Sequence, residues 1–93
     1  MIVSFADTDT DGVSKGRRSR KLPPSLHRSA MRKLWMLDAA TVLQDLRVPP
    51  GNRLEKLAGR YSHLHSIRIN DQWRIRFRWN DGNASEVEII DYH

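Results

Sequence analysis

The most regular hydrophobic pattern in the chain lies between residues 66 and 79. Its second half alternates strictly between apolar residues at positions 73, 75, 77 and 79 and arginines at positions 74, 76 and 78. Successive side chains of a β-strand point to opposite faces, so this stretch predicts a strand with one apolar face and one cationic face. Shorter alternations at 66–70 and 86–89 are separated from it by turn-forming residues at 70–72 and 80–83. We therefore expect a three-stranded antiparallel meander.

A helical period appears in the middle of the chain. Leu26, Ala30, Leu34 and Leu37 form one apolar stripe, directly after a pair of prolines that suits a helix start. The pattern continues to Leu46 and ends at the Pro-Pro-Gly of residues 49–51. We expect a bent helix or a helical hairpin, with the bend near residues 38–39, lying on one face of the sheet.

The N-terminal quarter is less regular. Residues 2–5 are apolar and suit an edge or central strand, whereas residues 7–16 favour at most a frayed turn of helix. Residues 15–24 are basic and predict a flexible connector, which is either a solvated loop or an arm that orders on RNA or on an acidic partner. The 93 residues predict a single domain of the α+β class.

Composition narrows the functional classes. The chain holds 16 Lys and Arg against 11 Asp and Glu, a net charge of +5, which favours a polyanionic partner such as RNA, DNA or an acidic protein. It has no cysteine, which excludes disulfides, cysteine zinc sites and a thiol nucleophile. No apolar run approaches the roughly 20 residues that span a bilayer, and we see no secretory signal, so we expect a cytoplasmic protein without membrane contact.

Two interpretations of the arginine row remain open. Arg76 and Arg78 can pair with Glu86 and Glu88 on the next strand, which would make them structural. Alternatively, the row binds phosphate, which guanidinium groups grip through two hydrogen bonds. Arg68 and Arg74 are the better candidates for phosphate, because they flank the first turn, where we expect fewer carboxylates.

The last three residues, Asp91, Tyr92 and His93, form a second candidate site. They directly follow an apolar strand, and RNA cleavage by transesterification needs a general base, a general acid and cations around the phosphate. Tyrosine with its ordinary pKa near 10 is a poor base at pH 7, so Tyr92 would need a neighbouring cation. The spacing of His63, His65 and His93 is a weak zinc pattern, and we predict neither a metal nor another cofactor.

Four blocks of the sequence closely resemble one known family. They are residues 36–41, 49–55, 66–75 and 87–93, in this order. They resemble the HigB-type toxins of the RelE/ParE superfamily of bacterial toxin–antitoxin systems, and the GraT-like branch looks nearest. The resemblance implies a microbial-RNase-type fold with helices on a small curved antiparallel sheet. It also implies a toxin that inhibits translation by cutting mRNA in the ribosomal A site without a metal.

The same resemblance implies partners and site residues. The partners are the ribosome, its mRNA and a cognate helix-turn-helix antitoxin of the HigA type, with operator DNA bound only through the antitoxin complex. Carried over by position, the expected catalytic residues are Arg68, Arg74, Asp91, Tyr92 and His93. The residues expected to bind RNA or the ribosome are Lys56, Arg60, Arg76, Arg17, Arg18, Arg20 and Lys21.

Two departures from the family pattern reduce the expected chemistry. Glu55 stands where some HigB toxins carry a histidine, and Ala58 stands where a lysine is frequent. We therefore predict a slow nuclease. The alternative is a non-catalytic toxin on the same fold that binds gyrase or ribosome-assembly components.

Overall fold

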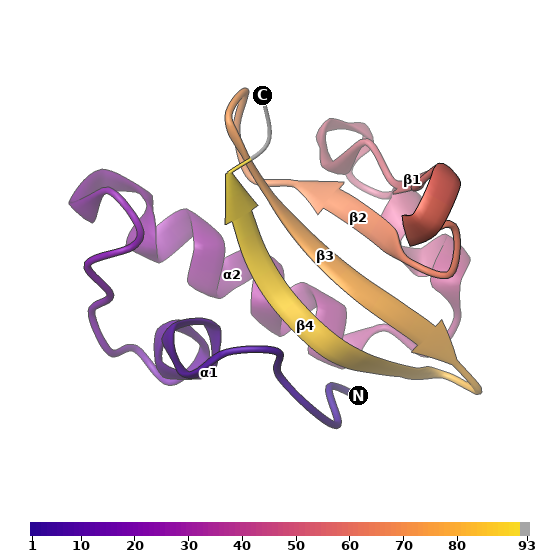
Figure 1. Cartoon of the computed structure of the whole chain (residues 1–93), viewed down its shortest axis with the longest axis horizontal. Coiled ribbons are helices and arrows are strands. Elements are labelled where there is room, and N and C mark those ends of the chain that lie inside the picture. The colour runs from indigo at the N-terminus through magenta and orange to yellow at the C-terminus, as the bar shows by residue number, and fades with distance from the viewer. Residues whose placement is uncertain (92–93) are drawn as a thin grey trace.

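Four antiparallel strands form one curved sheet in the order β1-β2-β3-β4 (Figure 1). The computed structural model describes residues 1–91, with Tyr92 and His93 outside the described part. The strands are β1 (Glu55–Lys56), β2 (His65–Arg68), β3 (Trp73–Asn80) and β4 (Asn83–Asp91). The predicted meander is thus confirmed, and the short β1 extends it beside β2.

Both predicted turns are confirmed. Between β2 and β3, the Asn70 side-chain carbonyl accepts hydrogen bonds from the backbone N–H groups of Gln72 and Trp73. Between β3 and β4, Asp81 and Gly82 both have positive φ, at 50° and 78°. Two consecutive left-handed residues match the right-handed twist of the flanking strands, so they close a tight hairpin.

A bulge in β4 keeps its apolar residues on one side of the sheet. Ala84 and Val87 are both buried although they are three positions apart, a spacing that would place them on opposite faces of a regular strand, and the pairing register shifts at this point. Glu86 has a positive φ of 53° and is the extra residue that a bulge inserts into one strand. The alternation predicted for residues 86–89 is confirmed, since Val87 and Ile89 are buried and Glu86 and Glu88 are not, and the bulge lies where it begins.

Helix α2 (His27–Ala39) covers the apolar face of the sheet (Figure 1). A short 3-10 helix, η1 (Pro24–Leu26), precedes it, so the predicted start at the proline pair is confirmed. Ala30, Leu34 and Leu37 of the predicted stripe are buried. They join a core to which the sheet contributes mainly Ile67, Trp73, Ile75, Phe77, Ala84, Val87 and Ile89.

The predicted continuation of α2 into a second helix is wrong. The backbone is extended at Ala40 and Val42. Between there and β1 the chain forms only 3-10 helices, η2 (Leu43–Arg47) and η3 (Pro50–Asn52). The Asp45 carboxylate accepts hydrogen bonds from the backbone N–H groups of Thr41 and Val42, which stabilises this extended turn against helix. Asn52 is fully buried, accepts a hydrogen bond from Lys33 and donates to the carbonyl of Leu46, which ties this region to α2.

The N-terminal region is more ordered than the sequence indicated. Residues 8–14 form helix α1 (Thr8–Ser14), whose first turn is capped by the Asp7 carboxylate, 2.7 Å from the Thr10 nitrogen. Thr10 is fully buried, and its hydroxyl accepts a hydrogen bond from the Ile89 N–H at 3.0 Å. The expectation of a frayed turn is wrong because this helix packs on both α2 and β4.

Residues 2–5 lie along β4 as an edge segment. Isolated parallel bridges join Ile2 to Ala84 and Phe5 to Val87. The basic segment 15–24 is also anchored, since Ser19 and Leu22 are buried and the Ser19 N–H donates to His27 Nε2 at 2.9 Å. Its flexibility stays a prediction. No helix within residues 1–91 is long and apolar enough to cross a membrane.

Candidate functional site

The arginines of β3 lie on the face of the sheet that α2 does not cover. Arg74 stands opposite Arg68 on β2 and Ile90 on β4, while Arg76 stands opposite Ser66 and Glu88. Residues that pair across an antiparallel sheet point to the same face. These side chains therefore share one surface, which we call the arginine face: Ser66, Arg68, Arg74, Arg76, Glu88 and Ile90.

Arg74 is the most enclosed cation of the arginine face, with 7% of its surface exposed. Its Nε donates to Ser66 Oγ at 2.9 Å and its Nη2 to the Arg53 carbonyl at 2.6 Å. The Glu55 carboxylate lies 3.7 Å away. Arg53 adopts a left-handed backbone conformation with φ 43°, which is part of the loop that brings its carbonyl to Arg74.

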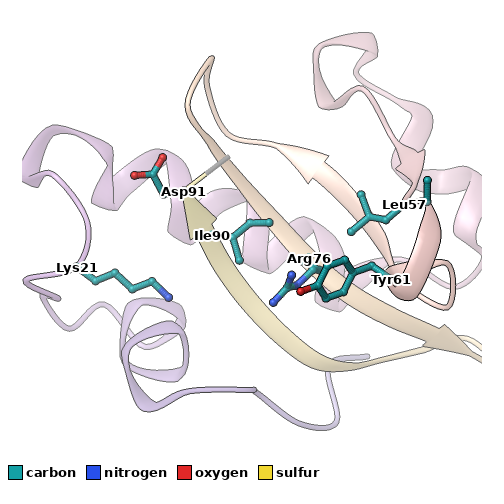
Figure 2. A pocket seen from close by; sticks show the side chains of 7 residues that line it. Lys21, Leu57, Tyr61, Arg76, Ile90 and Asp91 are labelled. Atoms are coloured by element: carbon teal, nitrogen blue, oxygen red, sulfur yellow. The ribbon is translucent and has the colours of Figure 1, made fainter. Parts of the chain in front are cut away.

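Arg76 is half-buried and has two partners. Its Nη2 donates to Glu88 at 2.7 Å, and its guanidinium lies over the Tyr61 ring, 5.0 Å from the ring centre (Figure 2). Tyr61 belongs to the 3-10 helix η4 (Gly59–Tyr61) and is 42% exposed. Sequence reasoning missed Tyr61. The available signal was an aromatic residue within the polar stretch 60–65 that precedes β2.

Lys21 approaches the arginine face from the side opposite to Tyr61 (Figure 2). Its Nζ lies 2.9 Å from Asp7 and 4.0 Å from Glu88, so Glu88 lies between Lys21 and Arg76. Together these side chains border a cleft of about 620 Å³, lined by Lys21, Leu57, Ala58, Tyr61, Arg76, Ile90 and Asp91 (Figure 2). We call it the Tyr61 cleft.

A second hollow of about 390 Å³ lies beside the Tyr61 cleft and is lined by Arg53, Glu55, Arg68, Asn70, Asp71 and Arg74. Arg68 forms an ion pair with Asp71. The expectation that Arg68 and Arg74 have fewer carboxylates nearby is wrong, because Asp71 of the turn and Glu55 of β1 supply them. The expected pairing of Arg76 and Arg78 is confirmed, with Arg78 3.5 Å from Glu86.

The other expected RNA-binding residues lie apart from the Tyr61 cleft. Arg17 and Arg18 line a groove with Arg28 of α2, and Arg20 lines a neighbouring one with His27. Arg60 is exposed on η4, next to Tyr61.

Lys56 points away from the arginine face. It pairs with His65, which stands opposite Phe77 on the core side of the sheet. Burial and the positive charge of Lys56 together hold the pKa of His65 below its ordinary value.

Of the terminal triplet, only Asp91 falls within the described residues. It lines the Tyr61 cleft and accepts a hydrogen bond from Gln72 Nε2 at 3.2 Å. The expected catalytic residues Tyr92 and His93 lie outside the described part of the chain. Residues 1–91 contain no group of three or more His, Asp or Glu side chains placed to hold a metal ion.

The fold agrees with one class of protein, the RelE-like toxins, which are small α+β proteins. A family model described as "RelE-like toxin of type II toxin-antitoxin system HigB" matches residues 5–93. The chain is 48% identical over 77 residues to "Toxin HigB-1" of Vibrio cholerae, covering 83% of this chain and 80% of that protein. It is also 33% identical over 78 residues to an uncharacterized protein of Haemophilus influenzae, covering 84% and 76% of the two chains.

The chain therefore belongs to the HigB toxins of type II toxin–antitoxin systems. Membership of a type II system means that a cognate antitoxin is its partner. The family's activity is RNA cleavage that inhibits translation, and the predicted family is confirmed.

Proposed function

We propose that this toxin cleaves mRNA on the ribosome without a metal ion, and that the arginine face is the site of cleavage. The observation that carries the proposal is the junction of the Tyr61 cleft with the hollow beside it. Arg74 and Ile90 are cross-strand neighbours, so the two hollows form one surface with Arg68 and Arg74 at one end and Arg76 at the other. A strand of RNA can follow this surface.

The expected reaction is a transesterification within the RNA. A general base takes the proton of the 2′-hydroxyl, and the 2′-oxygen attacks the neighbouring phosphorus. The bond from phosphorus to the 5′-oxygen breaks, and a general acid protonates that oxygen. The products are a 2′,3′-cyclic phosphate and a 5′-hydroxyl end, and the proton lost in the first step is balanced by the one gained in the last.

The chain offers residues for each role. The guanidinium group of Arg74 stabilises the negative charge that builds up on phosphorus, a role that a fixed cation in a partly buried site performs well. We assign proton transfer to the terminal residues Asp91, Tyr92 and His93, with Arg68 as a further cation. Since arginine keeps its charge at every physiological pH, this chemistry needs no bound metal.

The carboxylates of the arginine face limit this activity. Arg68, Arg74 and Arg76 each lie beside one of Asp71, Glu55 and Glu88, which reduces the positive charge available to RNA. This neutralisation supports the prediction of a slow nuclease. We further propose a helix-turn-helix antitoxin of the HigA type as the cognate partner, with operator DNA bound only through the toxin–antitoxin complex.

The test is cleavage of a defined message with and without ribosomes, by toxin that has been dialysed against a chelator and returned to chelator-free buffer and by untreated toxin. The proposal predicts new ends only with ribosomes, at equal rates for the two toxin preparations. A double variant, Tyr92→Phe with His93→Ala, should remove the ends while keeping the fold and antitoxin binding. A wild-type toxin that inhibits growth without cleaving any message would instead favour the non-catalytic alternative.

A further inference from the structure

The Tyr61 cleft combines features that suit a nucleobase. Leu57, Ala58 and Ile90 present apolar surface inside a hollow on an otherwise charged face, and none of the three is fully buried. Tyr61 and the Arg76 guanidinium add two flat groups. Unpaired bases of single-stranded RNA are bound by stacking on aromatic rings and on arginine planes, together with hydrogen bonds to their edges.

Groups for the rest of a nucleotide surround this apolar surface. Figure 2 shows Ile90 in the middle, with Tyr61 and Arg76 on one side and Lys21 on the other. Asp91 borders the cleft at the end of β4, but its carboxylate points away from Ile90 and accepts a hydrogen bond from Gln72 (Figure 2). The volume of about 620 Å³ lies within the roughly 300–1,000 Å³ that is usual for small-ligand sites.

The existing ion pairs also favour a base over a bare phosphate. Glu88 lies between Lys21 and Arg76, at 4.0 and 2.7 Å from their nitrogens. A phosphate at this point would meet a carboxylate as well as two cations. A neutral base meets no such repulsion and can bury Ile90, Leu57 and the Tyr61 ring.

We infer that the Tyr61 cleft binds one unpaired base of the message by stacking on Tyr61 and Arg76, and that Tyr61 thereby sets the base preference of cleavage. This inference rests on the proposed function for its role in cleavage, but base binding itself is independent of any reaction. Tyr61 acts as a specificity residue and takes no part in proton transfer.

Base binding is tested on the isolated toxin by NMR, with labelled methyl groups on Ile, Leu and Ala. Adenosine, guanosine, cytidine and uridine 5′-monophosphates are titrated separately, and ribose 5-phosphate serves as the probe that has the phosphate but no base. We expect the methyl signals of Ile90, Leu57 and Ala58 to shift with nucleotides, through the ring current of the base, and to stay in place with ribose 5-phosphate. Equal shifts with ribose 5-phosphate, or no shifts with any nucleotide, would overturn the inference.

Two variants separate stacking from packing. Tyr61→Phe keeps the ring, whereas Tyr61→Leu keeps an apolar side chain without it. The leucine variant should weaken nucleotide binding by about tenfold, since stacking of one base on an aromatic residue contributes roughly 1–3 kcal/mol, and the phenylalanine variant should bind as the wild type does. Because Tyr61 is 42% exposed, neither change should unfold the chain.

The role in cleavage is tested with ribosomes that carry a set of messages differing in one base at each A-site position. Tyr61→Leu should reduce the spread of kcat/KM among the four bases at one position, while Tyr61→Phe should preserve it. An unchanged spread in Tyr61→Leu would contradict the assigned role. Absence of cleavage by the wild type with nucleotide binding intact would instead refute the proposed function and leave the cleft a base-binding site.

Discussion

Arg74 stabilises the fold of the arginine face in addition to the chemical role that we propose for it. It is 7% exposed and donates hydrogen bonds to the Ser66 hydroxyl and to the Arg53 carbonyl. Those bonds join β3 to β2 and to the loop that ends η3. Loss of activity in an Arg74 variant therefore reports on stability as well as on phosphate contact.

We predict that Arg74→Met lowers the free energy of unfolding by about 3 kcal/mol. The change leaves buried acceptors without their charged donor, and hydrogen bonds to charged groups contribute about 1.5–3 kcal/mol each. Denaturation in urea measures the effect, with Arg78→Met as the matched control, because Arg78 is exposed and pairs only with the exposed Glu86 among the contacts of residues 1–91. Equal stabilities of the two variants would contradict this account of Arg74.

At the scale of single residues, the sequence predicted which face of a strand a side chain occupies better than it predicted the contacts of that side chain. Alternation placed Arg74 and Arg76 on one face correctly, because strand geometry is local. It gave no indication that Arg74 is buried, since the loop carrying Arg53 and Glu55 arrives from outside the alternating stretch. Tyr61 was missed for the same reason, because its contact with Arg76 spans β2 and the loop before it.

Helix α1 shows at the level of elements how tertiary contacts stabilise a short segment. Seven residues containing Thr, Asp and Gly have weak helical preference, and isolated helices of this length are unstable in water. The Asp7 cap and the buried hydrogen bond from the Ile89 N–H to Thr10 compensate for this weak helical preference and stabilise α1. No pattern in the neighbouring sequence predicts the Ile89 contact or the extra strand β1. The meander and α2 are predicted by hydrophobic periodicity, and the turns by turn-forming residues.

Asp7 makes the stability of α1 dependent on pH. Burial alone would raise the pKa of Asp7, but hydrogen bonds from Thr10 and the pairing with Lys21 outweigh it and hold the pKa below its ordinary 3.8. The native state thus favours the charged carboxylate. Its stabilisation is present above about pH 4 and is lost as the pH falls through the lowered pKa.

We predict that Asp7→Ala lowers the free energy of unfolding by about 1 kcal/mol at pH 7, as expected for loss of a helix cap. The difference from wild type should shrink as the pH falls below about 4, because the wild-type carboxyl then becomes protonated. Asp7→Asn keeps an acceptor for the cap and is the control for the charge. A difference that stays constant down to pH 2 would show that ionisation of Asp7 does not contribute.

At the scale of the whole molecule, two separate surfaces each gather several cations. Arg68, Arg74, Arg76 and Lys21 belong to the arginine face or its border, whereas Arg17, Arg18 and Arg28 line a groove beside α2. The net charge of +5 predicted a polyanionic partner, but charge alone could not divide the cations in this way. We assign catalysis to the first surface and contact with ribosomal RNA to the second.

We predict that a triple variant, Arg17→Gln, Arg18→Gln and Arg20→Gln, weakens ribosome binding and flattens its dependence on salt. Each lost phosphate contact should reduce the slope of log K against log salt by about 0.7–0.9. Lys21 is left in place, so the Tyr61 cleft stays intact. The measurement is ribosome affinity at several salt concentrations, and an unchanged slope would show that residues 15–24 make no phosphate contacts.

The central claim is that mRNA is cut at the arginine face, and mapping of mRNA 5′ ends on programmed ribosomes tests it most directly. Wild type is compared with Arg76→Gln, which removes one charge from the Tyr61 cleft, and with Arg47→Gln, which removes one from the exposed side of η2. We predict new ends at the A-site codon for wild type and Arg47→Gln, and a reduction of at least about tenfold for a folded Arg76→Gln, comparable to the loss of one charged hydrogen bond. Equal cleavage by all three proteins would contradict the account.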